Sequence, residues 1–169
     1  MANYISTVLS NSFKVKKEEI ENVRRAINIF EESCVDNDGR TVIASYEYSL
    51  DDDYYVVIDT RTNKVIGTYN SGYQELEDCI EVNGSLIEEE LANAHIKSEE
   101  EYDVEDFKEV PFYNYLQSVI DDTEKYILIK EIGHEKLRYT IAYGVCITKD
   151  AIKHFDIDTM ALQFANKDN

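Results

Sequence analysis

The charge of this chain is concentrated in one stretch, and that stretch limits how the chain can fold. Between residues 75 and 109 there are fourteen acidic and two basic residues, a net charge of −12 out of −18 for all 169 residues. Like charges repel one another across a compact surface, so such a run is costly to fold. It is typical either of a solvated segment or of a surface that binds a basic partner.

The length and composition of the chain exclude several classes of protein. A chain of 169 residues predicts a single domain over residues 1–169, and we treat residues 75–109 as an acidic insertion in it. The pI of about 4.4 disfavours direct binding to nucleic acid or to an anionic membrane, because both would repel the protein. The chain opens without a signal-peptide pattern and has no run of about 18 apolar residues, so we expect a cytoplasmic protein.

The cysteines and histidines give no indication of a metal or a cofactor. Cys34, Cys79 and Cys146 are widely spaced and form no Cys-x-x-Cys pair, which disfavours a disulfide framework or a structural zinc site. The three histidines form no metal-binding motif, and His134 beside Glu135 is interpreted as a surface residue rather than a general base. We therefore expect no cofactor.

Before the acidic insertion, the sequence predicts one helix and several strands. Residues 11–16 alternate like a short strand. A helix then follows, because apolar residues recur every three or four positions on one stripe, namely Ile20, Val23, Ile27, Phe30 and Cys34. The same periodicity predicts that Cys34 is a core residue and not a nucleophile. Residues 36–39 predict a turn rather than a calcium loop, because both terminal carboxylate ligands of an EF-hand are absent.

Three segments rich in β-branched and aromatic residues come next, at 41–49, 54–60 and 65–69. Short polar turns separate them, so they predict an antiparallel meander. Tyrosines in such strands typically pack half-buried with a solvated hydroxyl, and an aromatic contact face is the alternative. The aspartates at 51–53 are interpreted as a solvated turn, although a carboxylate pair such as Asp51 and Asp53 leaves an undetected hydrolase open.

Two capping boxes organise the acidic insertion. Ser85-x-x-Glu88 and Ser98-x-x-Glu101 match the pattern in which serine and glutamate satisfy the free amides at a helix start. Acidic first turns also suit the helix dipole. We therefore expect two short helices. The inward residues of the first are Leu86, Ile87, Leu91 and Ala94, and those of the second are only Tyr102 and Phe107.

The last third of the chain predicts a helix and a hairpin. Pro111 suits the first position of a helix with Phe112, Leu116, Val119 and Ile120 on one side. Residues 126–132 and 137–147 then read as a hairpin, in which every second residue of the second strand is apolar. Ala142 and Gly144 on the opposite face are small, so we expect a helix to pack closely over them. A strand over 152–157 and a short helix over 158–164 complete an α+β fold, with antiparallel sheets and helices packed on one face.

Two short elements near the ends of the chain have a recognisable sequence. One is Gly-His-Glu-Lys-Leu-Arg-Tyr at positions 133–139, followed by Tyr143 and Ile147, and the other is Asn11-x-Phe13-x-Val15-Lys16. They resemble a family of small acidic proteins carried by bacterial phages, plasmids and integrated elements. The resemblance covers about 25 residues and leaves out the acidic insertion. It implies a mobile-element origin and a role against host defence, and no active site.

These observations favour a non-enzymatic, anti-defence inhibitor of the anti-CRISPR or anti-restriction type that imitates DNA. Duplex DNA carries about one charge per 1.7 Å of axis, and acidic side chains one helical turn apart lie about 5–6 Å from each other. The expected partner is the basic nucleic-acid-binding groove of a host CRISPR effector or restriction enzyme. The residues expected to bind it are Glu88, Glu89, Glu90, Glu99, Glu100, Glu101, Asp103, Glu105, Asp106 and Glu109.

Two alternatives stay open besides the undetected hydrolase. The first is an adaptor that binds another protein through a tyrosine-rich surface, because the chain has thirteen tyrosines and tyrosine is favoured in interface hot spots. The second is that the acidic run is a solvated face without a partner. The oligomeric state does not follow from the sequence.

Overall fold

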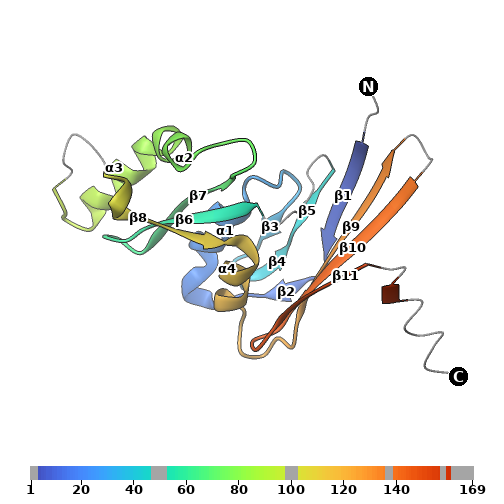
Figure 1. Cartoon of the computed structure of the whole chain (residues 1–169). Coiled ribbons are helices and arrows are strands. Elements are labelled where there is room, and N and C mark those ends of the chain that lie inside the picture. Colours follow the sequence, from blue (N-terminus) through green and yellow to red (C-terminus); the bar gives the residue numbers. More distant parts are fainter. Residues whose placement is uncertain (1–3, 47–52, 98–102, 136–138, 157–158, 161–169) are drawn as a thin grey trace, which may run out of the picture.

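The computed structural model describes residues 4–46, 53–97, 103–135, 139–156 and 159–160 (Figure 1). Over these ranges the chain has an α+β fold with antiparallel sheets, as the sequence predicts. The strands are β1 (Tyr4–Ser10), β2 (Phe13–Lys14), β3 (Cys34–Val35), β4 (Arg40–Val42), β5 (Ala44–Ser45), β6 (Tyr54–Asp59), β7 (Lys64–Asn70), β8 (Phe107–Pro111), β9 (Ile127–Glu135), β10 (Tyr139–Ile147) and β11 (Ile152–Asp156). The helices are η1 (Lys17–Glu19), α1 (Ile20–Ile27), α2 (Leu76–Val82), α3 (Gly84–Asn93), η2 (Val104–Asp106) and α4 (Phe112–Val119).

The strands form three antiparallel sheets. A five-stranded sheet, called the large sheet below, has the order β11-β10-β9-β1-β5. The small sheet has the order β7-β6-β8, and a third sheet has the order β2-β4-β3. Figure 1 shows α2 and α3 at one end of the molecule, over the small sheet, and the large sheet at the opposite end, with α4 between the two sheets.

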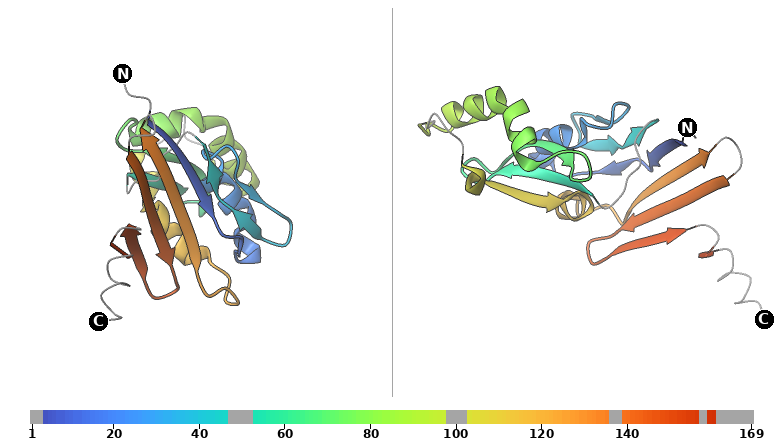
Figure 2. Two further views of the ribbon diagram at one scale, coloured as in Figure 1. Left: turned by 90° about the vertical axis from the view of Figure 1, so that its right-hand side faces the viewer. Right: turned by 45° about the horizontal axis from the view of Figure 1, so that its top comes forward.

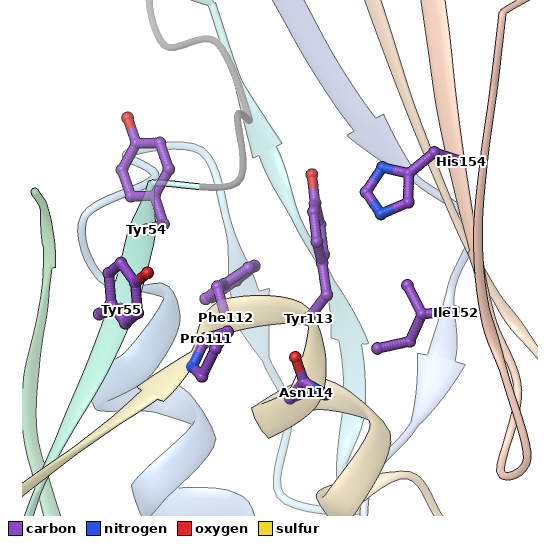
Figure 3. A pocket seen from close by; sticks show the side chains of 8 residues that line it. All are labelled: Tyr54, Tyr55, Pro111, Phe112, Tyr113, Asn114, Ile152 and His154. Carbon is purple, nitrogen blue, oxygen red and sulfur yellow. The ribbon is translucent and has the colours of Figure 1, made fainter. Parts of the chain in front are cut away.

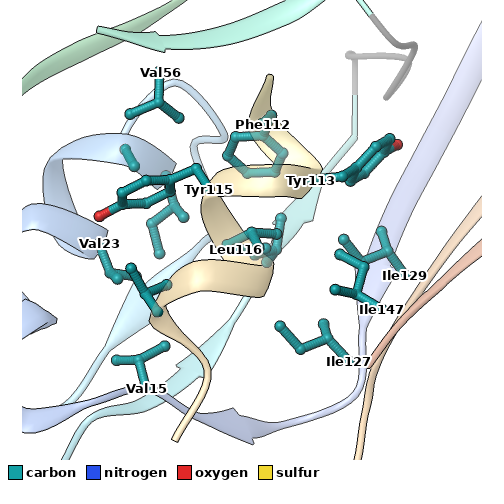
Figure 4. Packing of buried hydrophobic residues seen from close by; sticks show 14 of the residues in the cluster. Val15, Val23, Val56, Phe112, Tyr113, Tyr115, Leu116, Ile127, Ile129 and Ile147 are labelled. Carbon is teal, nitrogen blue, oxygen red and sulfur yellow. The ribbon is translucent and has the colours of Figure 1, made fainter. Parts of the chain in front are cut away.

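The main core lies around α4, between the small and the large sheet. Phe112 and Leu116 of α4 are almost fully buried, and Ile127 and Ile147 of the large sheet lie in the same cluster (Figure 4). Val56 of the small sheet closes it from the other side. Each such side chain stabilises the fold by about 1.5–3 kcal/mol through burial, so this cluster joins the two sheets into one body.

A second core, called the helix-side core below, lies on the other face of the small sheet. It consists of Val57, Ile66, Tyr69, Cys79, Ile80, Ile87, Leu91 and Phe107. Leu91 and Ile87 of α3 are fully buried there. The small sheet is therefore covered on both faces, by α1 and α4 on one side and by α2 and α3 on the other.

The N-terminal prediction is wrong in two places. Residues 4–10, for which no strand was predicted, form β1 in the interior of the large sheet, between β9 and β5. The helix from Ile20 ends at Ile27 instead of reaching residue 34. Phe30 is still buried in the turn that follows, but Cys34 pairs with Val42 in a short strand and is exposed, so it is not a core residue.

The turn at residues 36–39 is confirmed. The Asp36 carboxylate accepts hydrogen bonds from the backbone N–H groups of Asp38 (2.9 Å) and Arg40 (2.8 Å). Gly39 has a φ of +82°, and a Cβ atom there would lie 2.8 Å from the carbonyl oxygen of Val15. A glycine is needed at this position both for its backbone angle and for the close approach.

The predicted meander is only partly correct. β6 and β7 pair as expected, but residues 40–45 belong to the other two sheets, and the third strand of the small sheet is β8. β8 comes from the end of the acidic insertion, where a second helix was expected. Phe107 alternates with Lys108 along β8, so one face of the strand can enter the helix-side core.

The acidic insertion begins with a helix that the sequence analysis did not predict. The capping box lies at the start of α2, where Glu75 and Asp78 bond reciprocally to each other's backbone, and not at Ser85. The helix expected at Ser85 exists as α3, but it starts at Gly84 without a side-chain cap. The second predicted box, Ser98-x-x-Glu101, lies outside the described residues.

The predicted helix and hairpin of the last third are present. Pro111 is the N-cap of α4 rather than its first residue. β9 extends to Glu135, past the predicted loop start. No helix covers Gly144 within the described residues; the ring of Phe155, directly opposite on β11, lies over it, and a Cβ atom at Gly144 would come within 2.2 Å of that ring.

Candidate functional site

The ten carboxylates expected to bind a partner do not form one set. Glu99, Glu100 and Glu101 lie outside the described residues. The remaining seven come from three elements: Glu88, Glu89 and Glu90 from α3, Asp103, Glu105 and Asp106 from the segment of η2, and Glu109 from β8. Their contacts separate them into two groups.

Three of the seven contact other parts of the chain. Glu90 accepts a hydrogen bond from the Arg25 guanidinium at 2.7 Å, which ties α3 to α1. Glu109 accepts a hydrogen bond from the Tyr69 hydroxyl, and burial together with this bond raises the pKa of Tyr69 above its usual value. Glu90 and Glu109 therefore attach the acidic insertion to α1 and to β7, and their carboxylates are engaged within the protein.

Asp106 belongs to a network at the end of the β6–β7 hairpin. The Arg61 guanidinium bonds the buried carboxylate of Asp59 at 3.0 Å and the carboxylate of Asp106 at 2.9 Å. The same guanidinium lies 5.4 Å from the centre of the Phe107 ring, a distance typical of a cation–π contact. Asp106 therefore fixes the start of β8, and its carboxylate is likewise engaged within the protein.

Exposed carboxylates gather on the outer side of α2 and α3. Leu76, Cys79 and Ile80 turn one side of α2 towards the small sheet, as Ile87 and Leu91 do for α3. The opposite sides carry five exposed carboxylates, called the acidic ridge below: Glu77, Asp78, Glu81, Glu88 and Glu89, of which Asp78 also accepts the Glu75 backbone N–H at 3.0 Å in the capping box of α2. Only Glu88 and Glu89 were predicted as site residues.

The acidic ridge has a charge density close to that of a nucleic acid strand. Its carboxylates span residues 77–89 of two consecutive helices, a stretch that would be ~18 Å long on one straight axis at the helical rise of about 1.5 Å per residue. Five charges over that length correspond to about one charge per 4 Å, compared with one phosphate per ~3.4 Å of axis along one DNA strand. Asp103 and Glu105 are also exposed, where the Asp103 side chain caps η2.

Among the described residues, the tyrosines are divided between the core and separate exposed segments. Tyr54 and Tyr69 of the predicted aromatic face are buried, as are Tyr113 and Tyr115 of α4. Tyr46, Tyr73, Tyr126 and Tyr143 are exposed, and they come from four separate segments. Tyr48 lies outside the described residues.

An aromatic pocket of about 370 Å³ lies beside the N-terminus of α4 (Figure 3). Figure 3 shows Tyr54 and Tyr55 on one side and Tyr113 and His154 on the other, and the last two rings pack edge to face with their centres 5.5 Å apart. The His154 ring thus lies in a packed aromatic contact. No group of three or more His, Cys, Asp or Glu side chains suited to a metal is present within the described residues.

Two further candidates for reactive groups are the Cys79 thiol and the carboxylate pair of Asp51 and Asp53. Burial raises the pKa of the Cys79 thiol to about 11, so it is protonated at neutral pH. Asp53 is exposed, and Asp51 lies outside the described residues, which leaves the carboxylate pair suggested for a hydrolase undescribed. None of the described helices is long and apolar enough to cross a membrane.

Sequence reasoning missed α2 and the internal partners of the acidic residues. The signal for α2 was present, because Leu76, Cys79 and Ile80 have helical spacing and follow a Glu-x-x-Asp cap. The partners had no such signal, since Arg25 and Glu90 are 65 positions apart. Comparison with known proteins gives no further assignment: no protein-family model, no curated protein and no solved structure matches this chain.

Proposed function

We propose that this protein is an anti-defence inhibitor from a mobile genetic element, and that it blocks a host nuclease by presenting the acidic ridge in place of DNA. The observation that supports the proposal is the set of exposed carboxylates on the outer side of α2 and α3, at about the charge spacing of one DNA strand. The role against host defence rests on the family resemblance of the two terminal elements.

The rigidity of the ridge favours a specific partner over a merely solvated surface. The side chains of Ile87 and Leu91 are fully buried beneath it, and the Arg25–Glu90 ion pair joins α3 to α1. Because the carboxylates stand on helices that are already packed, little backbone entropy is lost when a partner binds. A groove lined with Lys and Arg, as in CRISPR effectors and restriction enzymes, has the complementary charge.

The proposed mechanism is competition for the DNA channel of the nuclease. The ridge carboxylates would pair with the Lys and Arg side chains that normally contact phosphates. Duplex DNA and the inhibitor would then exclude each other. Because the interaction is electrostatic, inhibition should weaken steeply as the salt concentration rises.

The experiment measures DNA cleavage by a purified CRISPR effector and by a purified restriction enzyme in the presence of the protein. The test variant reverses Glu81, Glu88 and Glu89 to lysine. The matched control reverses Glu18, Glu31 and Glu32, which are also exposed but lie beside α1, so the change in net charge is the same. We expect the test variant to lose inhibition and the control to retain it. Equal inhibition by both variants, or no inhibition of either enzyme by the wild type, would contradict the proposal.

The alternative is an adaptor that binds another protein through exposed tyrosines. Tyr73 favours it, because 89% of its surface is exposed just before α2. Replacing Tyr73 and Tyr46 with serine separates the two functions: an aromatic contact would be lost and would depend little on salt, whereas the ridge would keep its activity.

A further inference from the structure

The hydroxyl of Tyr115 is a buried polar group without a partner among the described residues. Only 3% of the Tyr115 surface is exposed, and its Oη atom forms no hydrogen bond with the described residues. Figure 4 shows the ring extending from α4 with its hydroxyl away from Phe112 and Leu116. An unpaired buried hydroxyl destabilises a fold, so native proteins normally give such a group a partner.

A pocket of about 230 Å³ borders this residue. It lies where α4, the small sheet and the η1–α1 segment meet, and its apolar wall includes Ile58 and Val110. The pocket is smaller than the ~300–1,000 Å³ typical of sites for drug-sized ligands. It is also several times larger than the ~30 Å³ that one water takes up in the liquid. Its size suits a small molecule of a few heavy atoms.

The pocket contains one acidic and one basic group. Glu19 and Lys108 both line it. Asn22 donates a hydrogen bond from Nδ2 to Oε2 of Glu19 at 2.9 Å and accepts one from the Val65 backbone at 3.1 Å, so the Glu19 carboxylate is held in place. Lys108 forms no ion pair with any residue within the described ranges.

Electrostatics favour a ligand that carries both charges. Burial, together with the nearby Glu19 carboxylate, raises the pKa of Tyr115, so its hydroxyl stays protonated and its oxygen can still accept a hydrogen bond. A ligand with only a positive charge would be repelled by Lys108, and a ligand with only a negative charge would be repelled by Glu19. A zwitterion satisfies both groups at once, because its ammonium group can pair with Glu19 and its carboxylate with Lys108.

We propose that this pocket binds a small zwitterion of the α-amino acid class. Its ammonium group donates to the Glu19 carboxylate and to the Tyr115 hydroxyl, and its carboxylate pairs with Lys108. A short aliphatic side chain contacts Ile58 and Val110. Lys108 and Val110 lie on the opposite face of β8 from Phe107, and Val110 packs against the main core, so the site is separate from the acidic ridge and does not depend on the proposed function.

The test is a titration of the ¹⁵N-labelled full chain, followed by NMR. L-alanine is the zwitterion probe, propylamine and propionate are its single-charge analogues, and the amides of Asn22, Asn63 and Ser118 report on the pocket. We expect saturable shifts with alanine at clearly lower concentration than with either analogue. Absence of saturable shifts with alanine, or equal affinity for one analogue, would overturn the proposal.

Two variants test the residues themselves. Tyr115→Phe removes only the unpaired hydroxyl, so the free protein should fold at least as stably as the wild type while its affinity for alanine falls about tenfold. Lys108→Met keeps the aliphatic stem and removes the charge, so it should weaken alanine binding but not propylamine binding. Wild-type affinity for alanine in both variants would show that the shifts arise elsewhere and would overturn the assignment.

Discussion

The outer face of the small sheet is covered by helices, whereas the outer face of the large sheet is not covered by any described element. The outer face of the small sheet is covered by α2 and α3, whose apolar sides form the helix-side core. Figure 2 shows the outer face of the large sheet without a covering element among the described residues. Leu9 and Ile132 are about half exposed on that face, and the exposed Lys130 lies beside them.

The net charge of the protein is distributed unevenly between these two regions. The covering helices present one apolar and one acidic side, so residues 75–109 carry a net −12 while still burying a core. Residues 111–169, which supply most of the large sheet, have nine acidic and seven basic residues, a net of −2. The described part of the acidic insertion, residues 75–97 and 103–109, is therefore folded as an acidic layer on the small sheet, and the exposed carboxylates of α2 and α3 lie on the side that faces away from the sheet.

The largest expected effect comes from the two cores. Leu116→Ala in the main core and Leu91→Ala in the helix-side core each remove a fully buried side chain, and each should lower the free energy of unfolding by about 2–5 kcal/mol. Leu116 lies in the main core between the small and the large sheet, so its truncation should destabilise the whole protein. Leu91 lies under the acidic layer, so its loss should mainly expose residues 76–93. Urea denaturation measures the first effect, and amide hydrogen exchange locates the second.

Hydrogen exchange also shows whether α2 and α3 unfold independently of the large sheet. If Leu91→Ala lowers protection in β9 and β10 as much as in α2 and α3, the acidic layer and the large sheet unfold as one unit. The distinction between them would then be one of composition only.

A smaller effect is expected on the open face of the large sheet. In Gly144→Ala the new Cβ atom would meet the Phe155 ring at 2.2 Å, so the ring must move, and we expect a loss of about 1–3 kcal/mol in the free energy of unfolding. In a Phe155→Ala background the same change should cost almost nothing. A double-mutant cycle measures this coupling, and additive effects would mean that Phe155 does not cover the glycine.

Periodic, local features of the fold were predictable from the sequence. The apolar stripe of α1, the stripe of α4 and the β9–β10 hairpin follow from apolar spacing within a few residues. β1 and β8 were missed because each is placed by pairing with a strand far away in the sequence, β9 for the former and β6 for the latter. Local pattern carries no information on such pairing.

The roles of individual carboxylates were not predictable for the same reason. Glu88, Glu89 and Glu90 look equivalent in the sequence, yet only Glu90 turns towards α1 and meets Arg25. Asp106 meets Arg61 from 45 positions away. The pocket beside Tyr115 joins residues of η1, β8 and α4, and its unpaired hydroxyl is visible only in three dimensions.

The smallest expected effect on stability is the difference between a carboxylate that is paired within the protein, Glu90, and an exposed carboxylate of the acidic ridge, Glu88. The Glu90 and Arg25 side chains are only 16% and 24% exposed, so Glu90→Gln should lower the free energy of unfolding by about 1 kcal/mol. Glu88→Gln removes an exposed carboxylate of the acidic ridge and should change it by less than about 0.5 kcal/mol. Urea denaturation at low salt measures both, because urea is uncharged and does not screen the ion pair. A cost at Glu88 equal to that at Glu90 would mean that the ridge also stabilises the fold, and its carboxylates would then be less free to pair with a partner.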